Sequence, residues 1–291
     1  MIFGTVSCTD HLHLAINLAK SVKQFHPESI FIICLVENYV HELAYQCESF
    51  DQIILANQLG NPDVDHNIKK YKRYEGAISV RGHFFNYLLN SFPSHSKFIY
   101  LDPDMKIFSP LDEVKELLDK HHMILTPHLL TPCPLDLIDQ FEIHHLTYGT
   151  YNLGFFAFTR SDESKRYINW ITKRLDKYCF EDLERGLFVD QKWVDAAPCF
   201  FDIFILKHPG YNVAFWNLYE RKLEKSGGEL IVNKFPLRCF HFSGIKNKRL
   251  ASTINLLGNN RIILSRIFNE YLNELVENGQ YVCEKIPWSY D

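Results

Sequence analysis

The feature that most constrains the fold is a short apolar run that ends in two carboxylates. Residues 98–101 read Phe-Ile-Tyr-Leu, and an unbroken apolar run of this length is typical of a strand buried on both faces of a sheet. Asp102 and Asp104 follow directly. Residues two apart on an extended chain point to the same side, and Pro103 disfavours the helical region for Asp102. The sequence therefore predicts a buried strand that ends in a fork of two carboxylates on extended chain.

Such a fork suits a hard divalent cation. Mg²⁺ and Mn²⁺ take oxygen ligands from one or two carboxylates and keep other positions for water or phosphate. Two other readings stay open, namely an exposed turn with two acidic residues and the Asp-x-Asp motif of the haloacid-dehalogenase phosphatases. That phosphatase motif normally follows the first strand and has Thr or Val two residues after its second Asp, whereas this chain has Lys106 there and a long segment before the fork.

The segments before the fork predict a strand, helix, strand order. Strand-like runs at residues 2–7 and 30–36 flank a segment with apolar residues at helical spacing, and further strands are expected at residues 52–55 and 123–126. This order predicts an α/β fold with a mixed, mostly parallel sheet flanked by helices and with ligands at the carboxyl ends of the strands. The turn after the first strand therefore supplies the candidate nucleotide-binding residues Thr5, Ser7, Thr9 and Asp10. Capping of the next helix is the alternative role for Asp10.

The C-terminal part predicts a helix that packs on the main domain. Apolar residues recur at helical spacing over residues 263–275, which indicates an amphipathic helix that ends near Gly279. Residues 67–74 concentrate four cations with two tyrosines, a pattern that fits either phosphate attraction or a solvated helix face. No low-complexity linker or repeat divides the chain. We therefore expect a single domain over residues 1–250, with residues 251–291 as a helical appendage packed on it.

Composition narrows the class of protein. A hydrophobic content of 46% over 291 residues is ample for a packed core, and a net charge of −4 argues against general nucleic-acid affinity. The eight cysteines include no C-x-x-C pair, which favours reduced thiols in the cytosol. No charged leader or membrane-length apolar stretch is seen. The expectation is a cytoplasmic protein whose C-terminal helix, with Arg261 and Arg266, makes at most peripheral contact with the inner face of a membrane.

Taken together, the motifs resemble the GT-A glycosyltransferases, particularly glycosyltransferase family 8 and related bacterial sugar transferases. The matching pieces occur in family order over roughly residues 2 to 250: the Thr/Asp-rich turn, Arg81, Tyr-Leu-Asp-Pro-Asp-Met (100–105), Tyr-Asn-Leu-Gly (151–154), Asp190-Gln191 and His241-Phe-Ser-Gly (241–244). Each motif is weak alone, and their order carries the resemblance.

The resemblance implies a metal-bound nucleotide-sugar. Asp102, Asp104 and His241 would be the metal ligands, and an oxygen and imidazole set suits Mn²⁺ better than Mg²⁺; a buried core histidine is the alternative for His241. By the same resemblance the early turn reads uracil and ribose, and the groups near the diphosphate and donor sugar are Arg81, Gly244, Lys246 and Lys248. The family places a lysine six residues after the histidine, where this chain has Asn247, so which flanking lysine contacts the diphosphate stays open.

Two further motifs would face the donor sugar. The resemblance implies that Asn152 and Gly154 line the sugar pocket and that Asp190 and Gln191 face the reactive carbon or its hydroxyls, although Asp190 and Gln191 also fit a helix N-cap and a solvent-facing amide. Family 8 enzymes retain anomeric configuration, which implies retention here. No decisive general base is evident among the candidates, and inversion stays open; these candidates are Glu142, His144, His145 and Asp190.

The sequence thus predicts a metal-dependent glycosyltransferase that moves a hexose from a UDP-sugar to a glycan, glycoprotein or lipid-linked saccharide. A nucleotidyltransferase that uses the same carboxylates is one alternative. A glycan-binding or scaffold protein that has kept the fold without turnover is the other. The sugar, the linkage and the oligomeric state are not encoded in any motif of the sequence.

Overall fold

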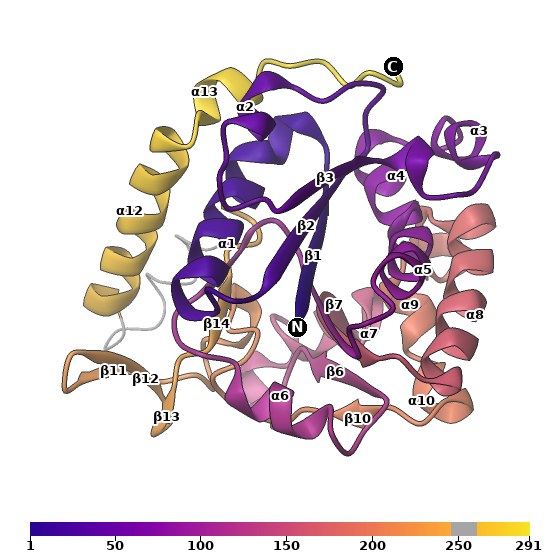
Figure 1. Ribbon diagram of the computed structural model, residues 1–291. Coiled ribbons are helices and arrows are strands. Elements are labelled where there is room, and N and C mark those ends of the chain that lie inside the picture. The colour runs from indigo at the N-terminus through magenta and orange to yellow at the C-terminus, as the bar shows by residue number, and fades with distance from the viewer. Residues whose placement is uncertain (246–260) are drawn as a thin grey trace.

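The computed structural model describes residues 1–245 and 261–291 and is built around a seven-stranded sheet (Figure 1). Its strands, in spatial order, are β10 (Phe204–Ile205), β6 (Met123–Pro127), β7 (Tyr151–Thr159), β4 (Lys97–Leu101), β1 (Ile2–Ser7), β2 (Ile30–Leu35) and β3 (Gln52–Leu55). The strand β1 pairs in parallel with β2 and β4, whereas β7 runs antiparallel to β4 and β6. The predicted mixed, mostly parallel α/β sheet is confirmed.

Helices cover both faces of this sheet. Those described are α1 (Leu12–Phe25), α2 (Glu42–Tyr45), α3 (Val64–Ile68), α4 (Arg73–Ser79), α5 (Arg81–Ser91), α6 (Asp112–Leu117), α7 (Glu142–Tyr148), α8 (Asp162–Tyr178), α9 (Gln191–Val194), α10 (Ala197–Phe200), α12 (Arg261–Glu277) and α13 (Gln280–Cys283). Ile2 and Val6 pack towards α5 and α8, whereas Phe3 packs towards α1 and α6, as the alternation of side chains along a strand requires. Figure 1 shows α5 and α8 on the opposite side of the sheet from α1.

Short strands and 3₁₀ turns complete the described chain. Two strand pairs are β5 (Met105–Ile107) with β14 (Cys239–His241) and β8 (Glu181–Asp182) with β9 (Leu187–Phe188). A small three-stranded sheet consists, in order, of β11 (Leu223–Ser226), β12 (Glu229–Val232) and β13 (Phe235–Pro236). The 3₁₀ turns are η1 (Thr9–His11), η2 (Ala56–Gln58), η3 (Leu135–Leu137), η4 (Leu183–Arg185) and η5 (Phe215–Asn217).

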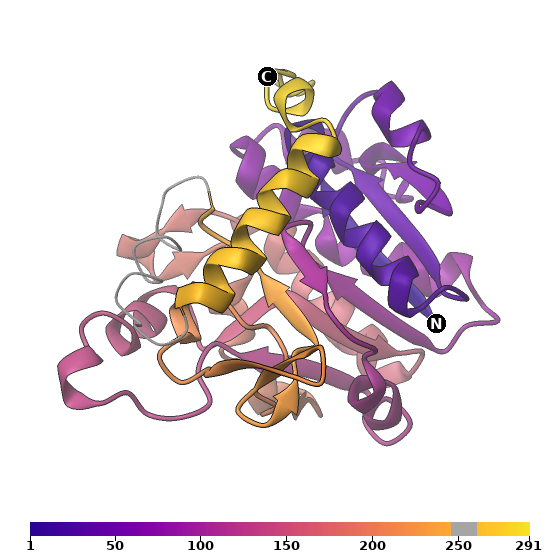
Figure 2. The same cartoon turned by 90° about the vertical axis from the view of Figure 1, so that its left-hand side faces the viewer.

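The helix α12 packs on α1 through a separate apolar cluster (Figure 2). Phe242 and Tyr271 stack with their ring centroids 3.6 Å apart, and Glu274 accepts hydrogen bonds from Asn17 at 3.0 Å and from Lys106 at 2.5 Å. The expected division at residue 250 lies outside the described residues and stays a prediction. No described helix is both long and apolar enough to cross a membrane.

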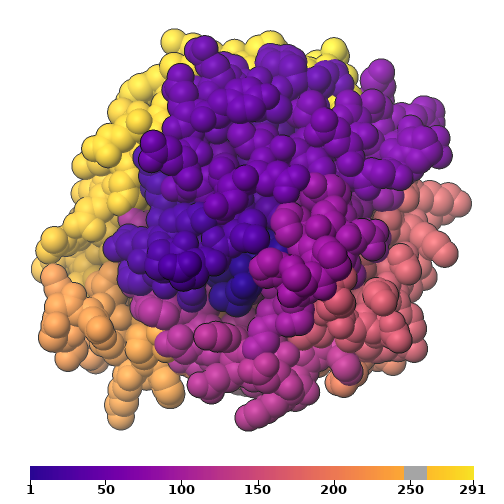
Figure 3. Space-filling model, in the orientation of Figure 1, coloured from indigo at the N-terminus to yellow at the C-terminus, as the bar shows by residue number. Residues whose placement is uncertain are grey.

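The residues after α13 cross to the carboxyl end of β2. The indole of Trp288 donates to the carbonyl of Val36 at 2.8 Å. The buried carboxylate of Glu37 accepts from the backbone N–H of Ser289 at 3.0 Å and from that of Thr9 at 2.9 Å. One carboxylate therefore ties the C-terminal residues to the turn after β1, and in Figure 3 the C-terminal residues lie against the N-terminal third of the chain.

Candidate active site

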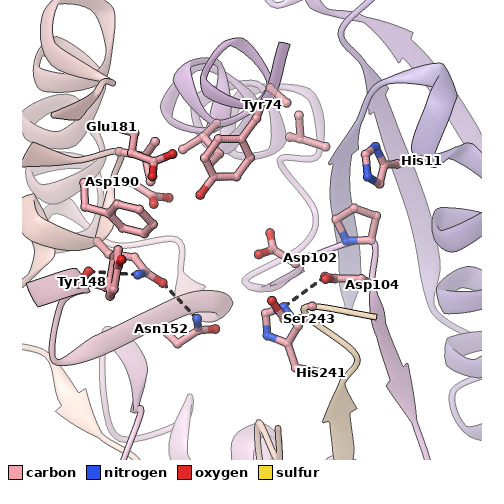
Figure 4. Close-up of a pocket in the computed structure, with 18 of the residues that line it drawn as sticks. His11, Tyr74, Asp102, Asp104, Tyr148, Asn152, Glu181, Asp190, His241 and Ser243 are labelled. Carbon is pink, nitrogen blue, oxygen red and sulfur yellow. Dashed lines mark hydrogen bonds and ion pairs between the residues drawn. The ribbon is translucent and has the colours of Figure 1, made fainter. Parts of the chain in front are cut away.

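A cavity of about 560 Å³ opens at the carboxyl ends of β1 and β4 (Figure 4). Its size lies within the usual range for pockets that bind small molecules. The wall formed by β1 and the turn after β4 carries His11, Asp102 and Asp104, while the opposite wall carries Asp190 and Tyr148. The cavity therefore lies where the order of strands and helices predicts a ligand site.

The two carboxylates lie in a tight turn between β4 and β5. The backbone N–H of Met105 donates to the carbonyl of Asp102 at 3.0 Å, so the expectation of extended chain through Asp104 is wrong. Pro103 occupies the second position of this turn, which its fixed φ favours. The turn nevertheless leaves both carboxylates facing the cavity.

His241 joins these carboxylates because β14 pairs with β5. The antiparallel register places His241 opposite Met105, and its Nε2 lies 3.0 Å from Oδ1 of Asp104. One ligand atom from each of Asp102, Asp104 and His241 can lie within 4.8 Å of the others. Two carboxylates and an imidazole are ligands that suit Mn²⁺, so the residues fit a divalent metal.

The charges of this cluster perturb one another. Burial opposes protonation of His241, but the Asp104 carboxylate outweighs it and raises the pKa of His241 above 6.5. Burial would raise the pKa of Asp104, but the positive charge of His241 outweighs it and lowers that pKa. In Asp102 burial prevails over the nearby Arg81 and raises the pKa. The shifts of His241 and Asp104 therefore both favour a positive imidazole beside a negative carboxylate, at the position where a cation would bind.

Arg81 bridges the two walls of the cavity. Its guanidinium donates to Asp190 at 2.6 Å and to Asp102 at 2.5 Å and lies 5.0 Å from the ring centroid of Tyr100. Arg81 is only 8% exposed and Asp190 is 2% exposed. Burial disfavours the charged guanidinium, yet the two carboxylates outweigh this and raise the pKa of Arg81. The charge of Asp190 is thus balanced by the buried guanidinium of Arg81, which makes Asp190 a weak candidate for a general base.

Asn152 lies between the metal-ligand cluster and Gln191. Its Oδ1 accepts from the N–H of Gly154 and from Nδ2 of Asn212, both at 3.0 Å. Its Nδ2 donates to Oε1 of Gln191 at 2.9 Å and to Nε2 of His128 at 3.2 Å. All four hydrogen-bonding positions of this amide are occupied by protein groups. A contact from Asn152 to a sugar would require one of these bonds to break.

Gly154 is required by the approach of His241. A Cβ at this position would lie 2.5 Å from Cε1 and 2.8 Å from Nδ1 of His241, closer than any real contact. The absence of a side chain at Gly154 therefore leaves the space that the imidazole of His241 occupies in this structure. On the opposite wall, Val189 has φ of 40°, a left-handed conformation that is strained for a β-branched residue. The strain lies directly before Asp190 and Gln191.

The other predicted residues fall into three groups. Ser7, Asp10 and Gly244 line the cavity, and Asp10 pairs with Arg73 at 2.9 Å instead of capping α1. Thr5 and Thr9 are buried beside it and do not line it. Lys246 and Lys248 lie outside the described residues.

Several lining residues were not predicted as members of the site: Arg73, Tyr74, His128, Tyr148 and Glu181. The run of cations over residues 67–74 was a signal for the first two of them. Of the candidate bases, His144 and His145 line the cavity, whereas Glu142 accepts from the N–H of Cys133 at 2.6 Å and does not line it.

Comparisons with known proteins agree with this architecture. No family model matches the sequence. The uncharacterized protein YfnD of Bacillus subtilis (strain 168) is 20% identical over 249 residues, which cover 83% of this chain and 77% of YfnD. The structure of the galactosyltransferase LgtC in complex with donor and acceptor sugar analogs aligns with a TM-score of 0.52 and 14% identity over 84% of this chain and 87% of LgtC.

A glycosyltransferase involved in glycosylation of the major capsid of PBCV-1 aligns less closely, with a TM-score of 0.49 and 10% identity over 87% of this chain and 97% of that one. The argument from similarity therefore rests on LgtC, and at that identity it concerns the fold. The chain is an α/β protein with the GT-A fold of the glycosyltransferases.

Proposed function

We propose that this protein is a metal-dependent glycosyltransferase that moves a hexose from a UDP-sugar to a saccharide acceptor. The observation that carries the proposal is the convergence of Asp102, Asp104 and His241 at the cavity of a GT-A fold. The opposite wall presents the polar side chains of Asp190 and Gln191 to the same cavity. The proposed acceptor is a glycan, a glycoprotein or a lipid-linked saccharide, and the aromatic side chains of Tyr74 and Tyr148 line the cavity where it would bind.

The proposed metal site follows from the side chains that can act as metal ligands. Asp102, Asp104 and Nε2 of His241 would hold Mn²⁺ or Mg²⁺, which supplies Lewis-acid stabilisation of the negative charge that develops on the leaving diphosphate. Ser7 and Asp10 lie on the same wall, where they support a nucleotide-binding role for the turn after β1. Arg81 holds Asp102 and Asp190 in place from the buried side.

Retention of configuration is the stereochemical outcome that we propose. Among the carboxylates that line the cavity within the described residues, Asp10 and Asp190 are paired with arginines and two others belong to the metal-ligand cluster. Gln191 is an uncharged amide that donates to the carbonyl of Tyr148 at 3.1 Å. Glu181 is exposed on the wall that carries Asp190 (Figure 4). An inverted product would identify Glu181 as the base to test.

Calorimetric titration of UDP tests the proposal. We expect binding in the presence of Mn²⁺ that is lost with EDTA and in Asp102→Asn, because the amide removes one negative ligand. Asp119→Asn is a matched control, since Asp119 is an exposed aspartate outside the cavity. UDP binding that ignores both the metal and Asp102 would contradict the proposed site. UDP as the nucleotide product of a sugar donor, identified by mass spectrometry, distinguishes glycosyl transfer from nucleotidyl transfer, which releases diphosphate or a sugar phosphate.

A further inference from the structure

Asn212 is a buried residue that contacts both His241 of the metal-ligand cluster and Asn152. Its Oδ1 lies 3.2 Å from Nδ1 of His241, and its Nδ2 donates to Oδ1 of Asn152 at 3.0 Å and to Oγ1 of Thr126 at 2.9 Å. Asn152 in turn donates to Gln191. A continuous series of hydrogen bonds therefore links His241 to Gln191 through two asparagines.

The direction of every bond in this series follows from its fixed ends. The N–H of Gly154 can only donate, so the atom of Asn152 that it contacts is Oδ1. The carbonyl of Tyr148 can only accept, so the atom of Gln191 that contacts it is Nε2. These two assignments leave Nδ2 of Asn152 facing Oε1 of Gln191, and Nδ2 of Asn212 facing Asn152. None of these three side-chain amides can be flipped by 180° without losing these hydrogen bonds.

The same logic fixes the tautomer of His241. Because Nδ2 of Asn212 is directed to Asn152, Oδ1 faces His241 and must accept, so Nδ1 of His241 carries a hydrogen. The neutral ring then has its lone pair on Nε2, the nitrogen that faces Asp104. A metal-ligating histidine commonly donates its other N–H to an oxygen in this manner, and loss of such a partner typically weakens metal binding by about 10–100-fold.

The backbone of Asn212 is held for this role. Its φ is 49°, a left-handed value that asparagine adopts more readily than most residues. Its side chain and backbone are 1% exposed in total, and its carbonyl accepts from Nδ2 of Asn217 at 3.1 Å. The backbone N–H of Asn212 also donates to Sγ of Cys239 at 3.2 Å, and this fixes the turn against β14, the strand that ends in His241.

We propose that Asn212 is a positioning residue with two roles: it presents Nε2 of His241 to the metal, and through Asn152 it fixes which face of the Gln191 carboxamide points into the cavity. The consequence for transfer rests on the proposed function. The hydrogen-bond assignment does not rest on it and can be tested without turnover.

Two substitutions separate the two roles. Asn212→Asp keeps an oxygen for His241 and removes the donor to Asn152, so Mn²⁺ affinity should stay within about threefold of wild type. Asn212→Gly tolerates the positive φ and removes both contacts, so Mn²⁺ affinity should fall by about 10-fold or more. Both substitutions should shift the side-chain NH₂ resonance of Gln191. This resonance is assigned as the one that is absent from the spectrum of Gln191→Met. Asn233→Gly is the matched control, because Asn233 has the same φ of 49° in a hairpin outside the cavity.

Mn²⁺ affinity is measured by electron paramagnetic resonance, and Gln191 is followed by ¹H–¹⁵N spectra of metal-free protein, with thermal unfolding as a check of folding. A folded Asn212→Gly protein with wild-type Mn²⁺ affinity and an unshifted Gln191 resonance would overturn the proposal. In the transfer assay, Asn212→Asp should lower kcat with little change in the KM for the donor. Absence of transfer in the wild type would refute the proposed function and leave the two binding and spectroscopic results to decide the role of Asn212.

Discussion

Replacement of Arg81 by methionine should destabilise the protein by about 3–5 kcal/mol, the usual cost of removing one partner from a buried ion pair. Arg81 is 8% exposed and bridges Asp102 and Asp190. Methionine fills a similar volume but leaves two carboxylates without a countercharge. Urea denaturation of metal-free protein at neutral pH measures the loss as a change in the free energy of unfolding.

Three variants make this prediction specific. Arg81→Lys should recover only part of the loss, because a lysine ammonium cannot form the two-armed contact of a guanidinium. The double variant Arg81→Met with Asp190→Asn should be more stable than Arg81→Met alone, since one unpaired charge is removed. Arg166→Met removes an exposed pair with Glu163 and should cost less than about 1 kcal/mol. Equal losses in Arg81→Met and Arg166→Met would contradict the interpretation of the buried bridge.

Replacement of His145 by phenylalanine should make the protein less sensitive to acid. Burial, followed by the charge of His144, lowers the pKa of His145 from 6.5 to about 3, against a smaller opposing effect of the Trp216 carbonyl. The ring of His145 stacks on that of His128, with the centroids 4.6 Å apart, and its nitrogens have no hydrogen-bond partner of acceptable geometry among the described residues. Phenylalanine can therefore replace it with the loss of no more than the weak contact to the Trp216 carbonyl.

The direction of the effect follows from proton linkage. Below pH 6.5 the unfolded chain binds a proton at His145 that the folded protein does not bind until about pH 3, so the histidine destabilises the fold progressively as the pH falls. At pH 4.5 the free energy of unfolding of the phenylalanine variant should exceed that of the wild type by about 3 kcal/mol beyond any difference seen at pH 7.5. Denaturant unfolding at both pH values measures this. A constant difference between the two proteins would show that His145 is protonated in the fold. His122→Phe is a control outside the cavity.

The elements that could be predicted are those with local signals. The strands at residues 2–7 and 52–55 were predicted with their observed bounds, because apolar runs between turns determine them locally. The predicted helix at 263–275 lies within α12 for the same reason. The helices α4 and α5 meet at Val80, and hydrophobic spacing alone gives no sign of this break.

The site could be predicted only where residues are close in sequence or match a motif. Asp102 and Asp104 follow a recognisable strand, and His241 was assigned by resemblance. The bond between Arg81 and Asp190 joins residues 109 positions apart, and that between Asn152 and Asn212 joins residues 60 apart. Such partners depend on strand order and register. Asn212 carries no local signal beyond its place in a turn, so its contacts with His241 and Asn152 were not predictable.

The C-terminal contacts with Glu37 have a consequence for folding during synthesis. The turn after β1 emerges from the ribosome early, yet one of its backbone bonds depends on a carboxylate whose other oxygen is bound by Ser289, which is translated almost the whole described chain later. Domains generally fold as units as they emerge. The nascent chain should therefore hold an incomplete ligand-binding turn until Trp288 and Ser289 have cleared the exit tunnel, which delays the capture of small molecules until long after β1 and β2 have been made.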